Sequence, residues 1–181
     1  MLQLSDIVRK LPFEIKSGSS SYNIKEFATT KYGIILDFDV FLKSKDKNLQ
    51  RDLCWDIDQK RALIVSVFKR VHIPSISVVI SSGYSHSNNQ TYKIIDGKQR
   101  LTTCISFFNN EFGIIHDNKE YFYKDLSDEM QSLFSRTDFT QNIAYEYPDR
   151  IISDEALIDW FDMINFSGTA QDEQHLKNLR S

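Results

Sequence analysis

Residues 94–103, Ile-Ile-Asp-Gly-Lys-Gln-Arg-Leu-Thr-Thr, place three kinds of local structure in one short run. The β-branched pair at its start favours a buried strand. Gly97 follows Asp96 and permits a tight turn, because glycine reaches backbone conformations that other residues rarely adopt. Apolar side chains then recur on one face of a helix expected over residues 99–109. The run therefore predicts a strand that leads directly into the first turn of a helix.

The rest of the chain alternates extended and helical patterns, which predicts a mixed α/β fold with a helical C-terminal third. The expected strands cover residues 76–80, 92–95 and 142–147, and two more flank a hairpin turn at residues 117–118. The expected helices run from a cap at Asp56 or Asp58 to about residue 70, and over residues 99–109, 128–134, 154–165 and 169–180. A serine-rich segment at residues 17–21 is expected to be a loop that follows a short N-terminal helix.

The composition of the 181 residues is typical of a globular protein whose cysteines are not joined in disulfides. Of these residues 41% are hydrophobic and 26% are charged, and no run approaches the roughly 20 apolar residues of a membrane-spanning helix. Cys54 and Cys104 are isolated from each other. The first residues lack the basic and apolar regions of a secretory signal. We therefore expect a cytoplasmic protein with no membrane partner.

The net charge of -3 is unevenly distributed along the chain. Residues 120–181 hold 13 acidic and 5 basic residues, which leaves 12 acidic and 17 basic residues in residues 1–119. A basic front part favours a polyanion or a nucleotide phosphate as partner. The alternative explanation for these charge counts is ordinary unevenness of the surface charge, without a polyanionic partner.

Several familiar catalytic and phosphate-binding patterns are missing from the sequence. It contains neither G-x-x-x-x-G-K-[ST] nor G-x-G-x-x-G, which excludes the two common phosphate-binding loops. G-x-S-x-G is also missing, and the four histidines are scattered without the spacing of a zinc site.

The turn at Gly97 is the strongest candidate site. A helix start offers free backbone N–H groups and a partial positive charge, and Lys98 and Arg100 add two cations for phosphate oxygens. Asp96 could hold Mg²⁺ or accept a proton, and Gln99 could orient an attacking water. An ordinary Asp-Gly turn with solvated Lys and Arg side chains gives the same pattern.

Two further segments could contribute to binding. Arg51 and Trp55 precede a helix and could grip a phosphate and stack on a base, although a core Trp and a surface ion pair explain them equally well. Asn165 and Glu173 near the C-terminus could reach a nucleotide or a metal ion. Helix capping by Asn165 and Thr169 is the alternative explanation.

Taken together, the blocks around Arg51 and Trp55, residues 63–74, residues 95–103 and residues 164–173 resemble the N-terminal domain of GmrSD-type restriction enzymes. This family has a D-G-Q-Q-R motif and belongs to the ParB/sulfiredoxin-like superfamily. The resemblance implies a small mixed sheet flanked by helices, with residues 1–34 as an N-terminal extension and residues 35–181 as the domain.

The same resemblance implies that the motif turn binds the phosphates of a nucleoside triphosphate, and that such domains often hydrolyse it to regulate DNA cleavage in phage defence. Carried over by position, the resemblance places the site at Asp96, Gly97, Gln99 and Arg100, with Arg51 as a second contributor. Together with the residue patterns above, this predicts catalytic roles for Asp96, Gln99 and Arg100. It predicts nucleotide binding by Arg51, Trp55, Gly97, Lys98, Thr102 and Asn165. Lys98 departs from the motif, where the family has Gln, so binding is expected to be strengthened and hydrolysis is in doubt.

The nuclease domain of complete enzymes has no counterpart in these residues. A nuclease domain or subunit outside this chain is therefore expected as a partner, together with nucleotide and DNA. The leading hypothesis is a nucleotide-binding regulatory module. The alternatives are a DNA-binding module without nucleotide hydrolysis, and a protein-interaction module in which the turn is only structural.

Overall fold

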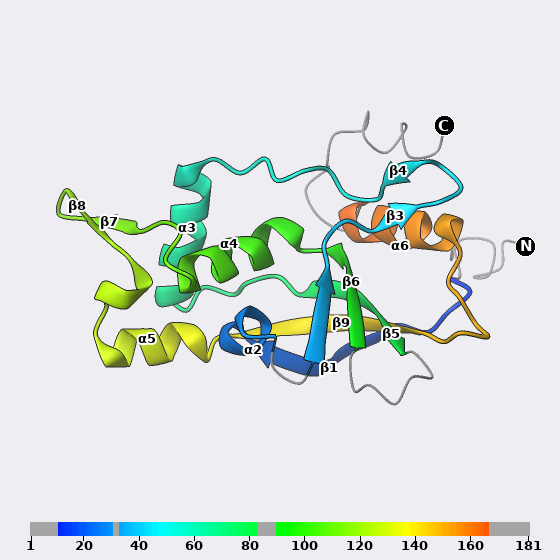
Figure 1. Ribbon diagram of the computed structural model, residues 1–181, viewed down its shortest axis with the longest axis horizontal. Coiled ribbons are helices and arrows are strands. Elements are labelled where there is room, and N and C mark those ends of the chain that lie inside the picture. Colours follow the sequence, from blue (N-terminus) through cyan, green and yellow to red (C-terminus); the bar gives the residue numbers. More distant parts are fainter. Residues whose placement is uncertain (1–10, 31–32, 83–89, 167–181) are drawn as a thin grey trace, which may run out of the picture.

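The structure is a computed structural model, and it describes residues 11–30, 33–82 and 90–166. Figure 1 shows helices on both sides of a twisted sheet. The strands are β1 (Lys16–Asn23), β2 (Ile34–Asp37), β3 (Phe41–Leu42), β4 (Lys47–Asn48), β5 (Ile76–Ser82), β6 (Gln90–Asp96), β7 (Ile114–His116), β8 (Lys119–Tyr121) and β9 (Asp138–Glu146). The helices are α2 (Ile24–Ala28), α3 (Ile57–Phe68), α4 (Lys98–Phe108), α5 (Asp128–Ser135) and α6 (Asp154–Phe166), with a 3-10 turn at Tyr123–Asp125.

The main sheet has five strands in the order β1-β9-β5-β6-β2. β5 lies parallel to β9 and antiparallel to β6, while β6 lies parallel to β2. β1 pairs antiparallel with β9 at one edge. Two small hairpins, β3–β4 and β7–β8, lie outside this sheet. The fold is thus a mixed α+β arrangement, as the sequence predicts.

Both faces of the sheet are covered. On one face, α2, α3, α4 and α5 bury apolar side chains against alternate strand residues such as Val78 and Ile94. On the opposite face, α6 and the β3–β4 segment pack on Val79, Ile95 and Ala144. Because side chains alternate between the faces of a strand, β6 contributes to both cores. The end of β6, and with it the start of α4, lies where the two layers meet.

Most of the expected elements are confirmed. α3 follows a cap at Asp56, which accepts a hydrogen bond from the Gln59 backbone N–H at 2.8 Å. α5 follows a cap at Ser127, and Asp117 and Asn118 turn the β7–β8 hairpin with positive φ angles. β9 begins earlier than the pattern indicates, at Asp138.

The expectation of a loop at residues 17–21 is wrong, because these residues lie within β1. Small polar residues give no strand pattern in the sequence, and the strand instead depends on pairing with β9, which holds at Ser17 and Ser21 with a register shift between them. β1 belongs to the same sheet as β5, β6 and β9, and α2 contributes to the same core as α3, α4 and α5. The expected helices before residue 11 and at residues 169–180 lie outside the described residues. No helix among the described residues is long and apolar enough to cross a membrane.

The buried carboxylate of Glu146 connects several segments on the α6 face of the sheet. Glu146 accepts hydrogen bonds from Ser81 Oγ at 2.7 Å and from the Ile152 backbone N–H at 3.1 Å, and it forms an ion pair with Lys93. Burial raises the pKa of Glu146, but hydrogen bonds from Lys93 and Ser81 and the charge of Lys93 outweigh this effect and lower it overall. The charged carboxylate therefore joins β5 and β6 to the segment that follows β9.

We expect this network to stabilise the fold only while Glu146 is ionised. Because the folded-state pKa is lowered, the stabilisation is fully present above the unfolded-state value of about 4.3 and is lost as the pH falls through the folded-state value. Glu146→Gln should therefore lower the free energy of unfolding, measured with urea, more at neutral pH than at about pH 3. Glu111→Gln, which alters an exposed side chain, is the control. Equal losses from Glu146→Gln at both pH values would contradict this account.

Candidate functional site

The start of α4 is shaped by a left-handed glycine. Gly97 has φ 100° and is the N-cap of α4, and no side chain in the described part of the chain makes a capping hydrogen bond at this helix start. A Cβ at this position would lie 2.5 Å from Ile76 Cγ2, which real Cβ atoms essentially never do. The backbone thus passes directly over β5, and the first N–H groups of α4 are left for another acceptor.

Arg100 lies one turn into α4 and closes one side of the turn. Its Nη2 donates to Asp96 Oδ2 at 2.8 Å and to the Ser75 carbonyl oxygen at 3.2 Å. The Arg100 Nε–H is buried and has no hydrogen-bond partner among the described residues. An unsatisfied buried N–H on a cation is costly, so this edge of the guanidinium favours an added acceptor.

Lys98 supplies a second cation. Its side chain is only 6% exposed, and its Nζ lies 2.7 Å from Asp39 Oδ1, whereas the Asp39 side chain is 69% exposed. A buried ammonium group requires an anionic or polar partner, because its removal from water is unfavourable. The exposed Asp39 carboxylate remains hydrated without Lys98, so another anion can take its place.

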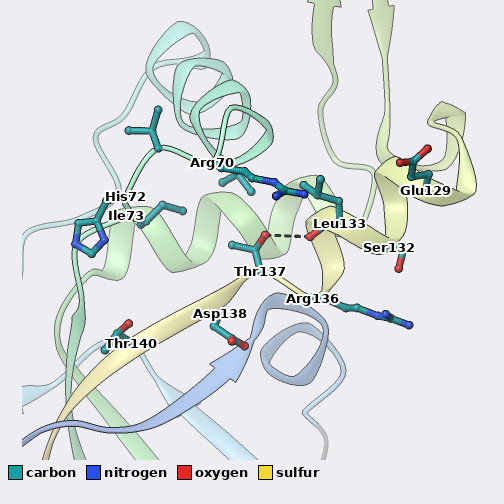
Figure 2. Close-up of a pocket in the computed structure, with 12 residues that line it drawn as sticks. Arg70, His72, Ile73, Glu129, Ser132, Leu133, Arg136, Thr137, Asp138 and Thr140 are labelled. Atoms are coloured by element: carbon teal, nitrogen blue, oxygen red, sulfur yellow. Dashed lines mark hydrogen bonds between the residues drawn. The ribbon is translucent and has the colours of Figure 1, made fainter.

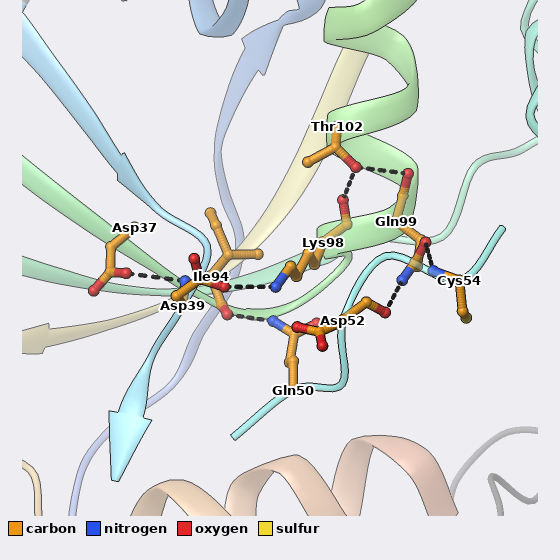
Figure 3. Close-up of polar contacts among 9 residues, drawn as sticks. All are labelled: Asp37, Asp39, Gln50, Asp52, Cys54, Ile94, Lys98, Gln99 and Thr102. Carbon is orange, nitrogen blue, oxygen red and sulfur yellow. Dashed lines mark hydrogen bonds and ion pairs between the residues drawn. The ribbon is translucent and has the colours of Figure 1, made fainter. Parts of the chain in front are cut away.

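Gln99 holds a neighbouring segment against the start of α4. Figure 3 shows the chain of residues 50–55 passing beside Gln99. The Gln99 Oε1 accepts from the backbone N–H groups of Cys54 at 3.3 Å and Trp55 at 3.4 Å, and its Nε2 donates to the Asp52 carbonyl at 3.0 Å. The amide that was expected to orient water is therefore engaged with the protein backbone in this structure.

These groups enclose a hollow of about 110 Å³, which we call the α4 hollow. It is lined by Gln50, Arg51, Trp55, Asp96, Gly97, Lys98, Gln99, Arg100 and Phe161. Among the described residues, all of the predicted site residues except Thr102 and Asn165 therefore meet at one place. The candidate Glu173 lies outside the described residues. Gln50 and Phe161 were not predicted. Gln50 adjoins Arg51 in the sequence, whereas Phe161 arrives from α6 through packing that no local pattern reveals.

Thr102 and Asn165 lie outside the lining of the α4 hollow. The Thr102 hydroxyl donates to the Lys98 carbonyl oxygen at 2.6 Å, within α4. Asn165 is buried inside the last turn of α6, where its Nδ2 donates to the Phe161 carbonyl oxygen at 2.8 Å. Both side chains bond to the carbonyl one turn back in their own helix, which explains their polar character locally.

The described residues offer little other reactive chemistry. No group of three or more His, Cys, Asp or Glu side chains gathers there to hold a metal ion. Burial raises the pKa of Cys104 to about 12, so its thiol is not a nucleophile at neutral pH. Asp96 is the carboxylate that lines the α4 hollow. One carboxylate suits Mg²⁺ that arrives with phosphate, since that ion keeps several waters and binds substrate oxygens.

A separate hollow of about 560 Å³ lies between the end of α3 and α5. Figure 2 shows Arg70, Arg136 and Glu129 around it, together with the hydrogen bond from Thr137 to the Leu133 carbonyl. None of the predicted site residues lines it. The candidate site therefore remains the smaller α4 hollow.

Comparison with known proteins gives one result. The family described as the N-terminal domain of the GmrSD restriction endonuclease matches residues 38–179. No curated protein and no solved structure matches the chain. The matched range contains every residue that lines the α4 hollow.

Gly97→Ala tests whether the turn requires glycine for its close approach as well as for its φ angle. We expect a loss of about 3 kcal/mol in the free energy of unfolding, from the left-handed conformation and from overpacking against Ile76. Gly18→Ala is the control, because Gly18 has φ 65° but a Cβ there would lie 4.0 Å from the nearest atom. It should lose about 1 kcal/mol. Equal losses in urea unfolding would show that the contact with Ile76 contributes nothing.

Proposed function

Since the chain belongs to the family of GmrSD restriction endonuclease N-terminal domains, we propose that it is the nucleotide-binding regulatory module of a DNA-restriction and phage-defence system. The family name joins this domain to an endonuclease. The module accordingly acts with a nuclease domain or subunit, and the nucleotide it binds regulates DNA cleavage.

The observation that carries the proposal is the uncapped start of α4 beside a cation with an unsatisfied N–H. The N–H groups after Gly97 and the Arg100 guanidinium border the same hollow. Helix starts attract phosphate through these amides and the helix dipole, and guanidinium adds charge-assisted hydrogen bonds. Lys98 and Arg51 bring the lining to three cations against the single carboxylate of Asp96.

The size of the α4 hollow limits which part of a nucleotide enters it. Its volume of about 110 Å³ is below the roughly 300–1,000 Å³ of pockets that enclose a whole small ligand. Phosphate groups therefore occupy the hollow, and the nucleoside lies at its mouth. Arg51 is exposed and Trp55 is half-buried there, so the indole ring can stack on a base.

Binding and hydrolysis are separate steps in this proposal. Asp96 would hold Mg²⁺, which neutralises phosphate charge when it is bound. Hydrolysis additionally requires a group that orients water, and the Gln99 amide is bonded to the backbone of residues 52–55. We therefore propose phosphate binding as the primary activity, with hydrolysis dependent on release of the Gln99 amide from that segment.

Arg100→Ala should weaken binding of a nonhydrolysable nucleoside triphosphate with Mg²⁺ by about tenfold to hundredfold, because charge-assisted hydrogen bonds are lost. Isothermal calorimetry measures this. Arg61→Ala is a matched control, because Arg61 is similarly exposed and also donates hydrogen bonds to a carboxylate, Glu120, and a carbonyl, Gly113, besides a longer ion pair with Asp58. It should bind like the unmodified chain.

Thermal melts of both variants separate lost binding from lost folding. If Arg100→Ala unfolds, Arg51→Ala provides the test, since the exposed Arg51 should leave the melting temperature unchanged and weaken binding severalfold. No heat of binding for the unmodified chain, or equal affinities for all variants, would overturn the proposal.

Asp39→Asn should strengthen triphosphate binding by about threefold to tenfold, because it removes the carboxylate that competes for the Lys98 ammonium group. It should also lower the melting temperature without ligand, since the buried Lys98 ammonium group loses its anionic partner. Asp37→Asn is the control, because the one bond of Asp37 within the described residues is from the Asp39 backbone N–H. Unchanged affinity in Asp39→Asn would show that Lys98 does not meet the ligand.

A further inference from the structure

A second concave surface lies on the α6 face of the sheet, away from the turn at Gly97. This groove has a volume of about 550 Å³, and its floor is the network of Ser81, Lys93 and Glu146. Three large apolar side chains line it although they are exposed: Phe41 at 52%, Tyr147 at 47% and Ile151 at 72%. Single exposed apolar residues are ordinary, but several that gather on one hollow mark an interaction surface.

The charge of the groove limits what can bind there. Four carboxylates line it against two ammonium groups, on Lys43 and Lys93. Glu146 neutralises Lys93, and Asp39 is paired with Lys98 on its other side. Asp37 accepts the Asp39 backbone N–H and Asp154 accepts the Ser44 backbone N–H, and neither forms an ion pair within the described part of the chain. Such a surface repels nucleic acid and anionic membranes, and it attracts Lys and Arg.

We propose that this acidic groove docks a polypeptide segment in which apolar side chains adjoin Lys or Arg. The apolar side chains pack between Phe41, Tyr147 and Ile151, and the basic groups face Asp37 and Asp154. The floor is already held by hydrogen bonds to Glu146, so docking orders few groups and loses little entropy. The inference does not depend on nucleotide binding, because Ile151 lies outside the α4 hollow.

The test is to pan a library of random peptides against the full chain and to measure the affinity of the enriched peptides. We expect enriched peptides to combine apolar residues with Lys or Arg. They should bind at least about tenfold more weakly to Ile151→Asp, which adds a charge at the centre of the apolar contact. Ile115→Asp is the matched control, because Ile115 is 49% exposed in β7 and lies outside the groove. Calorimetry with nucleotide should be unchanged in both variants.

Three outcomes would overturn the proposal. The first is no enrichment, or enrichment of acidic peptides. The second is equal affinity of the enriched peptides for the unmodified chain and for Ile151→Asp. The third is a dimer of the unmodified chain, seen by sedimentation, that Ile151→Asp dissociates, because a second copy would then cover the groove.

Discussion

The contact between Gly97 and Ile76 is the constraint on which the rest of the site depends. It lets β6 enter α4 without an intervening loop, so the first N–H groups of the helix emerge beside the end of the strand. Any side chain at this position would push α4 away from β5. Asp96 and Arg100, on either side of the turn, would then lose the 2.8 Å contact between Oδ2 and Nη2. The backbone amides, the carboxylate and the guanidinium are therefore positioned by one close approach.

The two cations of α4 that line the hollow are each already paired with a carboxylate of the chain. Arg100 contacts Asp96, and Lys98 contacts Asp39, which also lines the acidic groove. When no ligand is bound, these ion pairs offset the unfavourable desolvation of the two cations. A phosphate that binds competes with the carboxylates for the cations. The ion pair between Lys98 and Asp39 thus joins one residue that lines the α4 hollow to one that lines the acidic groove.

Local patterns were sufficient for most elements after Trp55 and for much of the site, whereas α2, β2, β3 and β4 were not predicted. Periodicity and caps located α3, α5 and the β7–β8 hairpin, and a single run located the strand, turn and helix around Gly97. They failed at β1, whose serines carry no strand signal and which is held by pairing with β9. They also could not show that Gln99 bonds to the backbone of residues 52–55, since that contact joins segments distant in the chain. Which polar side chains are free, and which are occupied, is a property of tertiary packing.

The most direct measurement is a crystal structure with a nonhydrolysable nucleoside triphosphate and Mg²⁺. The account predicts phosphate oxygens within hydrogen-bond distance of the backbone N–H groups that follow Gly97 and of Arg100, with the base beside Trp55. Phosphates bound elsewhere on the chain, with the turn at Gly97 unchanged and Arg100 still satisfied only by Asp96 and Ser75, would contradict it.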